Sequence, residues 1–217
     1  MNITQMKNCI KGSGIFLVKF DRSQMFLGTY GMIFFALISA FALKMHGTPI
    51  ARICSVIMCM LLALVVVCSI ISLVKPLTVK KRVFYFTFAS TLMSLMFLLD
   101  SAMFFDALDV PYYGIVYVVP VLFAIYSICV MRPNPQRKGK PKGKIVFSGP
   151  LITVSGAGFW LGRALRPALA QLEQPALYCV LAIGFYVVGC LLSLCSFGFL
   201  YLYYIRVLES KGVKLDD

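Results

Sequence analysis

Charged residues inside apolar segments are the main candidates for chemistry in this chain. Asp100 lies 17 residues beyond Val83, where an apolar run starts, and Arg163 lies 17 residues beyond Val146 in a later run. If both runs cross a membrane in the same direction, the two side chains sit at similar depth near the outer interface, where they could pair. Arg166 is an alternative partner for the carboxylate. We expect Asp100 to have either a structural, interfacial role or a role in binding an ion or ligand.

The other polar residues form no recognisable catalytic constellation. The apolar runs contain no G-x-S-x-G, no H-E-x-x-H, no Walker A sequence and no Cys–His arrangement. His46, the single histidine, and Glu173 fall in segments that we expect to be solvated loops. Too few ionisable side chains remain for acid–base chemistry within a membrane. The sequence therefore predicts neither an enzyme nor a bound cofactor.

The eight cysteines do not suggest a metal site. None of them forms a C-x-x-C pair, and only one histidine is present, which is not a zinc or iron–sulfur pattern. Most lie inside or at the edge of apolar runs, where a thiol packs as a small apolar group. Cys9 and Cys129 instead flank basic segments, so acylation of these two is an alternative.

Stripes of small and hydroxyl-bearing residues run along three of the apolar segments. Small residues let membrane helices approach closely, and Ser and Thr hydroxyls form hydrogen bonds between helices. The stripes comprise Thr87, Ser90, Thr91, Ser94 and Ser101; then Ser148, Ser155, Gly158 and Gly162; and finally Ala182, Gly189, Ser193 and Ser196. We expect these three segments to pack together; alternatively, the stripes line a polar path. Because Asp100 lies about 140° around its helix from its stripe, a single continuous path is not supported.

Pro120 lies in the middle of a further apolar run. Proline has no N–H group, so the carbonyl of Val116 loses the donor that a helix would normally provide. This predicts a kink in that segment. Since proline is also common in membrane helices, the kink by itself indicates no particular function.

Apolar runs of membrane-spanning length must position these residues. The chain has 217 residues, of which 60% are hydrophobic and 13% charged, and its mean hydropathy is +0.89. One soluble core of this size could not bury so many apolar side chains, whereas lipid accepts them on the outside. Runs close to the ~20 residues needed for a crossing cover 25–43, 53–74, 83–105, 110–131, 145–165 and 177–204. The predicted fold class is all-α, a polytopic membrane bundle of six transmembrane helices.

The distribution of basic residues predicts the orientation of this bundle. Lys and Arg are enriched in cytoplasmic loops. With six crossings, 17 of the 21 basic residues fall on the side of the two termini and four on the other. We therefore expect both termini in the cytoplasm and the chain in the plasma or inner membrane. If the run 145–165 did not cross, the basic segment 132–144 and the C-terminal tail would lie on opposite faces.

The predicted organisation is a basic N-terminal segment (1–24), a transmembrane domain (25–205) and a cytoplasmic tail (206–217). The first segment is either a loose, basic stretch or a helix on the inner leaflet, because Ile3, Met6, Cys9 and Ile10 share a helical face. The small-x-small sequence Ala40–Ala42 allows a second alternative. The run 25–43 would then be a cleaved signal peptide, and five spans would remain.

The segment 132–144 is the one long connector, and it is rich in Pro, Gly and Lys. Basic side chains near a membrane surface attract anionic lipid headgroups by about 1 kcal/mol each. The candidate contacts are Arg137, Lys138, Lys140, Lys142 and Lys144. These residues could also dock an acidic cytosolic partner or serve only to fix the topology. Since the charge of +13 lies between apolar runs, we expect no nucleic-acid partner.

Three classes of function remain. The outline of a basic N-terminal segment, six spans and cytoplasmic termini resembles small bacterial ABC-exporter permeases and vitamin-uptake binding subunits, although no motif carries this resemblance. It implies a small permease or a membrane subunit of a transport system, with a cytosolic ATPase or another membrane subunit as partner. The alternative is a non-transporting accessory, sensory or scaffold membrane protein, and a membrane enzyme comes last.

Overall fold

A computed structural model shows residues 1–12, 49–74, 78–130 and 172–214 as helices and short connections, with no strand in these ranges. The helices are α1 (Ile3–Gly12), α3 (Pro49–Val74), α4 (Val79–Ala107), η1 (Tyr113–Tyr117), α5 (Val118–Val130), α7 (Gln174–Ser193), η2 (Leu194–Phe197) and α8 (Gly198–Ser210). The predicted all-α class is confirmed for this part of the chain. The predicted spans 25–43 and 145–165 lie outside the described residues.

Two helical segments are long and apolar enough to cross a membrane. They are Val79–Ala107, with 29 residues, and Gln174–Ser210, in which α7, η2 and α8 join into 37 residues. The core helix of a soluble protein would be mostly buried, but only 44% and 22% of their apolar windows are buried. Large apolar side chains are also exposed along α3 and α5, for example Ile53, Ile70 and Phe123. This apolar exterior is typical of helices that meet lipid.

The four predicted runs within the described residues correspond to helices with shifted ends. α3 and α4 each begin a turn earlier than predicted, so Lys80 and Lys81 stand in the first turn of α4 and not in a loop. The last helix continues to Ser210 and not only to 204. It ends there because Gly212, with φ of 75°, lets the N–H groups of Gly212 and Val213 bond back to Glu209 and Leu208.

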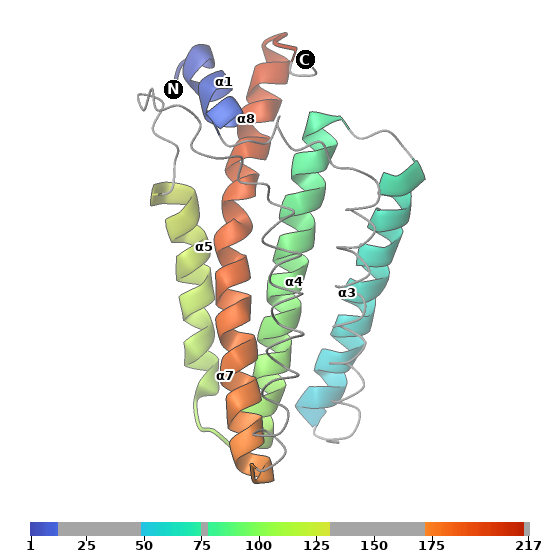
Figure 1. The fold of residues 1–217 in the computed structure, drawn as a ribbon, viewed down its shortest axis with the longest axis vertical. Helices are drawn as coiled ribbons and strands as arrows, with labels where there is room; N and C mark the ends of the chain where they lie inside the picture. The colour runs from blue at the N-terminus through green and yellow to red at the C-terminus, as the bar shows by residue number, and fades with distance from the viewer. Residues whose placement is uncertain (13–48, 75–77, 131–171, 215–217) are drawn as a thin grey trace.

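α4 lies at the centre of the described bundle, between α3 on one side and the α7–η2–α8 segment on the other (Figure 1). It runs antiparallel to that segment. The ring of Phe104, near the end of α4, lies 5.6 Å from that of Tyr178 at the start of α7. At the opposite end, Lys80 forms a 3.2 Å ion pair with Glu209 of α8. The α7–η2–α8 segment therefore packs along the whole length of α4.

The N-terminal segment packs against protein. α1 lies beside α8 at the end of the bundle where α8 terminates (Figure 1). Its face of Ile3, Met6, Cys9 and Ile10 joins a core with Tyr201, Ile205 and Leu208 of α8 and with Val79 and Val83 of α4. Residues 3–12 are thus helical and not loose, and their apolar face is covered by α8 instead of lying on a leaflet. Cys9 is only 2% exposed in this core, and burial raises the pKa of its thiol.

Charge separates between the two ends of the bundle. The end formed by α1, the start of α4 and the end of α8 carries Lys7, Lys11, Lys80, Lys81, Arg206, Lys211 and Lys214. Acidic residues dominate the other end, with Asp106 and Asp109 where α4 ends and Glu173 where α7 begins. Arg52 of α3 also lies there, and among residues 1–12, 78–82 and 198–214 at the basic end Glu209 is the acidic one.

A tight turn at the acidic end returns the chain to the bundle. Asp109 and Tyr112 both have positive φ, 52° and 55°. The N–H groups of Asp109 and Val110 bond back to Asp106 and Phe105, which closes the last turn of α4. η1 consequently starts within six residues of the end of α4, and Tyr117 reaches back to that helix.

Candidate functional site

One face of α4, which packs against α7 and α8, has hydroxyl groups at heptad spacing. Thr87, Ser94 and Ser101 are all buried. The Oγ of Ser94 donates a 2.8 Å hydrogen bond to the carbonyl of Gly189 on α7. Ser90 and Thr91, which belong to the same stripe in sequence, donate to the carbonyl of Thr87 within their own helix. Thr87 and Ser94 contact the α7–η2–α8 segment, whereas the Ser101 hydroxyl lies 3.1 Å from that of Tyr117 in η1.

Two glycines permit the close approach of the helices along this face. A Cβ atom at Gly189 would lie 2.8 Å from Cγ and 3.3 Å from the backbone N of Leu98. A Cβ atom at Gly198 would clash with Oγ1 of Thr87. This buried oxygen has no hydrogen-bond partner among the described residues. We call the contact made by Thr87, Ser94, Gly189 and Gly198 the glycine seam.

The long C-terminal helical segment changes its winding beside the seam. Between α7 and α8 the four residues of η2 form a 3₁₀ turn. The hydroxyl of Ser193 donates to the carbonyl of Cys190, and that of Ser196 donates to the carbonyl of Ser193. Serine bonds of this kind to a preceding carbonyl bend a helix. Ser193, predicted as a packing residue, therefore satisfies its hydroxyl within its own segment.

A second polar group lies near the acidic end, where η1 meets α4 and α7. The hydroxyls of Tyr117 and Ser101 are 3.1 Å apart, and the Tyr117 ring makes an edge contact with that of Tyr186. The Tyr186 hydroxyl donates a 2.8 Å hydrogen bond to the carbonyl of Val116. Pro120 cannot donate to this carbonyl, which also accepts a backbone N–H bond where η1 ends. α7 thus supplies a second donor to the Val116 carbonyl.

The structure also corrects the position of the proline. Pro120 is the third residue of α5, after the 3₁₀ turn η1, and not the centre of one continuous α-helix. In the first helical turn the missing N–H is tolerated, because no earlier α-helical carbonyl needs it. Pro120 accordingly stands where the regular α-helix starts, with the irregular backbone before it.

We predict that Tyr186→Phe destabilises the protein by about 1 kcal/mol, because the hydrogen bond between α7 and the Val116 carbonyl is lost. Tm in mild detergent should fall by roughly 2–4 °C. Tyr126→Phe is the matched control, since Tyr126 is an exposed tyrosine of α5. Equal Tm values for the two variants would show that the hydrogen bond contributes nothing.

Asp100 lies on a different face of α4, toward α3. At helical spacing it shares that face with Met96 and Met103, which pack in one buried cluster with Cys54 and Met58 of α3. Asp100 is only 2% exposed. Asp100 and Asp106 are close enough to Cys54 to interact with it electrostatically. The carboxylate is therefore interior to the bundle, although it lies near the acidic end.

Other candidates from the sequence fall outside the described residues. These are Arg163, Arg166, Ser155, Gly158, Gly162, Arg137, Lys138, Lys140, Lys142, Lys144 and His46. The pairing of Asp100 with Arg163 or Arg166, and the packing of the run 145–165, remain predictions. Of the predicted packing residues, the structure brings Ser94 and Gly189 into direct contact.

The sequence interpretation did not single out Tyr117 or Tyr186. It also missed the buried cluster that contains Met58. The one available signal was Pro120, which cannot donate to the Val116 carbonyl, but the sequence does not show that Tyr186 bonds to it. Among the described residues, His, Cys, Asp and Glu side chains form no group of three that could hold a metal ion. Searches of protein-family models, curated proteins and solved structures found no match to this chain.

Proposed function

We propose that this chain is a multi-pass protein of the plasma or inner membrane, with six spans and both termini in the cytoplasm. Support comes from the two helices of spanning length and from α3, whose 26 residues extend about 39 Å. The basic end of the bundle also holds both α1 and the end of α8. Basic residues at that end are expected to face the cytoplasm.

Within that membrane we propose a transport role, as a small permease or a membrane subunit of a transport system. The observation that carries this proposal is the buried carboxyl of Asp100 inside an apolar bundle. An ionisable group costs free energy within a membrane and commonly marks a path or binding site for ions or solutes. A partner would supply energy, and a cytosolic ATPase docking at the basic connector is the partner that fits best.

An accessory or scaffold membrane protein is the second candidate. The glycine seam favours it, because close helix packing with a hydrogen bond from Ser94 across the contact is what a rigid structural bundle needs. In that case Asp100 only joins helices. The two candidates differ in whether the chain works with an energy-supplying subunit and whether Asp100 affects activity.

Purification of the tagged full-length chain from membranes of its own cells tests the proposal. We expect the chain to need detergent for extraction and to capture an ATPase subunit, identified by mass spectrometry. Asp100→Asn should leave the capture intact and lower the ATP hydrolysis rate of the complex several-fold. Asp109→Asn is the matched control, because Asp109 is an exposed acid at the same end of the bundle.

Two results would overturn parts of this proposal. Recovery of a stable monomer without detergent would exclude the membrane location. A stable detergent-solubilised protein without ATPase, or an unchanged hydrolysis rate in Asp100→Asn, would replace the transport role by the accessory one.

A further inference from the structure

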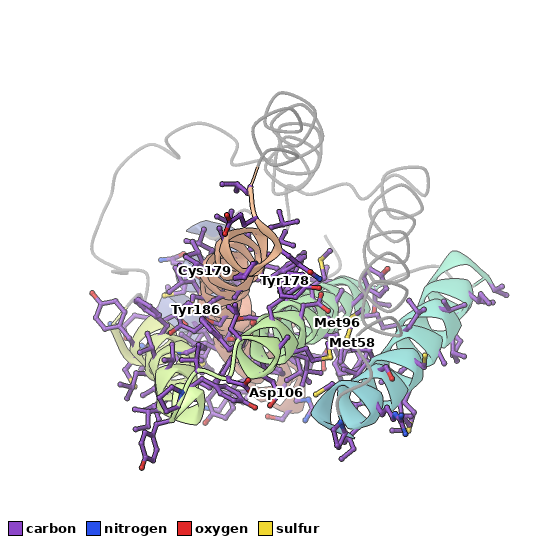
Figure 2. All side chains as sticks on the ribbon, turned by 90° about the horizontal axis from the view of Figure 1, so that it is seen from below. Met58, Met96, Asp106, Tyr178, Cys179 and Tyr186 are labelled. Atoms are coloured by element: carbon purple, nitrogen blue, oxygen red, sulfur yellow. The ribbon has the colours of Figure 1, made fainter. Side chains whose placement is uncertain are left out.

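Sulfur atoms gather at the contact between α3 and α4. Four buried side chains, Cys54, Met58, Met96 and Met103, make up the core of this contact, and leucines surround them. Figure 2 shows Met58 and Met96 side by side where α4 faces α3. All four are less than a tenth exposed, and Met58 is 1% exposed. A thiol and three thioethers thus share one interior, largely water-free space.

The register of the two helices places three of these sulfur-bearing residues within about one helical turn along the bundle. α3 ends at Val74 and α4 begins at Val79, and the two helices run antiparallel side by side (Figure 1). At 1.5 Å per residue, Met58 lies about 24 Å from its end of α3 and Met96 about 26 Å from its end of α4. Cys54 lies one turn further along, on the same face of α3 as Met58. Met103 lies two turns beyond Met96 on α4 and belongs to the same buried cluster.

We propose that Cys54, Met58 and Met96, with Met103 beside them, form a binding site for a monovalent soft metal ion, Cu(I). Thiolate and thioether sulfurs are the ligands that select Cu(I), which accepts few ligands and needs no water. On binding, the Cys54 thiol releases its proton to solvent, and the resulting thiolate neutralises the charge of the ion. The thioethers stay neutral, and the oxidation state of the metal does not change.

The electrostatics of the surroundings favour a cation at this position. Asp100 lies on α4 between Met96 and Met103, and Asp106 stands one further turn along the helix. Both acids interact with Cys54. A site with one thiolate and neutral thioethers holds Cu(I) without net charge, which limits the cost of burying the ion. The site concerns binding alone and does not depend on a transport role.

Methionine and cysteine also pack as ordinary apolar side chains, and the experiment separates the two explanations. Purified full-length protein in mild detergent is titrated anaerobically with Cu(I) in competition with a chromogenic Cu(I) chelator. We expect one tightly bound ion per chain and an X-ray absorption spectrum with only sulfur in the first coordination shell. The bound ion should also raise Tm.

The variants identify the ligands. Cys54→Ser should abolish tight binding, and the double variant Met58→Leu, Met96→Leu should weaken it at least tenfold. Cys59→Ser with Met60→Leu is the matched control, since these residues have the same types on the same helix but are exposed. Both Leu substitutions keep the volume of the core, so a folded variant is expected.

Three outcomes would overturn the site. One is the absence of binding that competes with the chelator. Another is a first coordination shell that contains nitrogen or oxygen. The third is equal loss of binding in the Cys59 and Met60 control, which would assign the ion to exposed thiols.

Discussion

Gly189→Val should destabilise the protein by about 2–4 kcal/mol and lower Tm in mild detergent by on the order of 10 °C. A Cβ atom at this position would meet the Leu98 side chain at 2.8 and 2.9 Å and the backbone N of Leu98 at 3.3 Å. The side chain of Leu98 can rotate away, but the backbone of α4 cannot. The helices must therefore separate, and the hydrogen bond from Ser94 to the Gly189 carbonyl is lost with the contact.

Gly184→Val is the matched control for this change. Gly184 lies in the same helix, and nothing lies within 4 Å of the position where its Cβ would be. Since glycine is a poor helix former, valine there should leave Tm unchanged or raise it slightly. We therefore expect a large drop in Tm for Gly189→Val and no drop for Gly184→Val. Similar Tm values for both variants would mean that α4 and α7 do not pack closely at Gly189.

The all-helical class follows from composition and length, and within the described residues two of the predicted spans correspond to helices long and apolar enough to cross a membrane. Long apolar runs require helices in lipid, because every backbone N–H and C=O must be satisfied inside the segment. α3 and α4 appear where the runs 53–74 and 83–105 were expected. Their ends extend further, since charged residues such as Lys80 continue the helix outside an apolar stretch and pair there.

Tertiary partners were harder to predict than elements. The face of Ile3, Met6, Cys9 and Ile10 was visible in the sequence, but periodicity cannot tell a lipid surface from α8 as the partner of that face. The Tyr186 donor for Val116 is 70 residues away in sequence. No local spacing encodes such a contact.

The candidate metal site could not be predicted from the sequence either. Cysteine spacing was searched for ligand pairs on one segment, and none is present. The cluster of Cys54, Met58 and Met96 combines two helices and a ligand type that packs in most cores without binding a metal. Its members become a group only once α3 and α4 are placed side by side.

The contact between Thr87 and Gly198 supplies the second large effect, as a coupling between two substitutions. Gly198→Ala alone should destabilise the protein by about 1–3 kcal/mol, because the new methyl group clashes with the Thr87 hydroxyl. Thr87→Ala alone should be nearly neutral. It removes a methyl group from the core, but it also removes a buried oxygen that has no partner among the described residues.

The double variant Thr87→Ala, Gly198→Ala should recover most of the stability lost in Gly198→Ala, because Thr87→Ala removes the atom with which the new methyl group clashes. The expected coupling free energy is about 1–2 kcal/mol, measured from Tm or unfolding of all four proteins in the same detergent. Thr87→Ala combined with Gly184→Ala provides the additive control, since Gly184 has open space around it. Additive losses in the Thr87 and Gly198 pair would show that the helices are not in contact there. Coupling found only for this pair would show that α8 packs directly against α4. The glycine seam would then hold α4 against both helices that flank η2, α7 and α8.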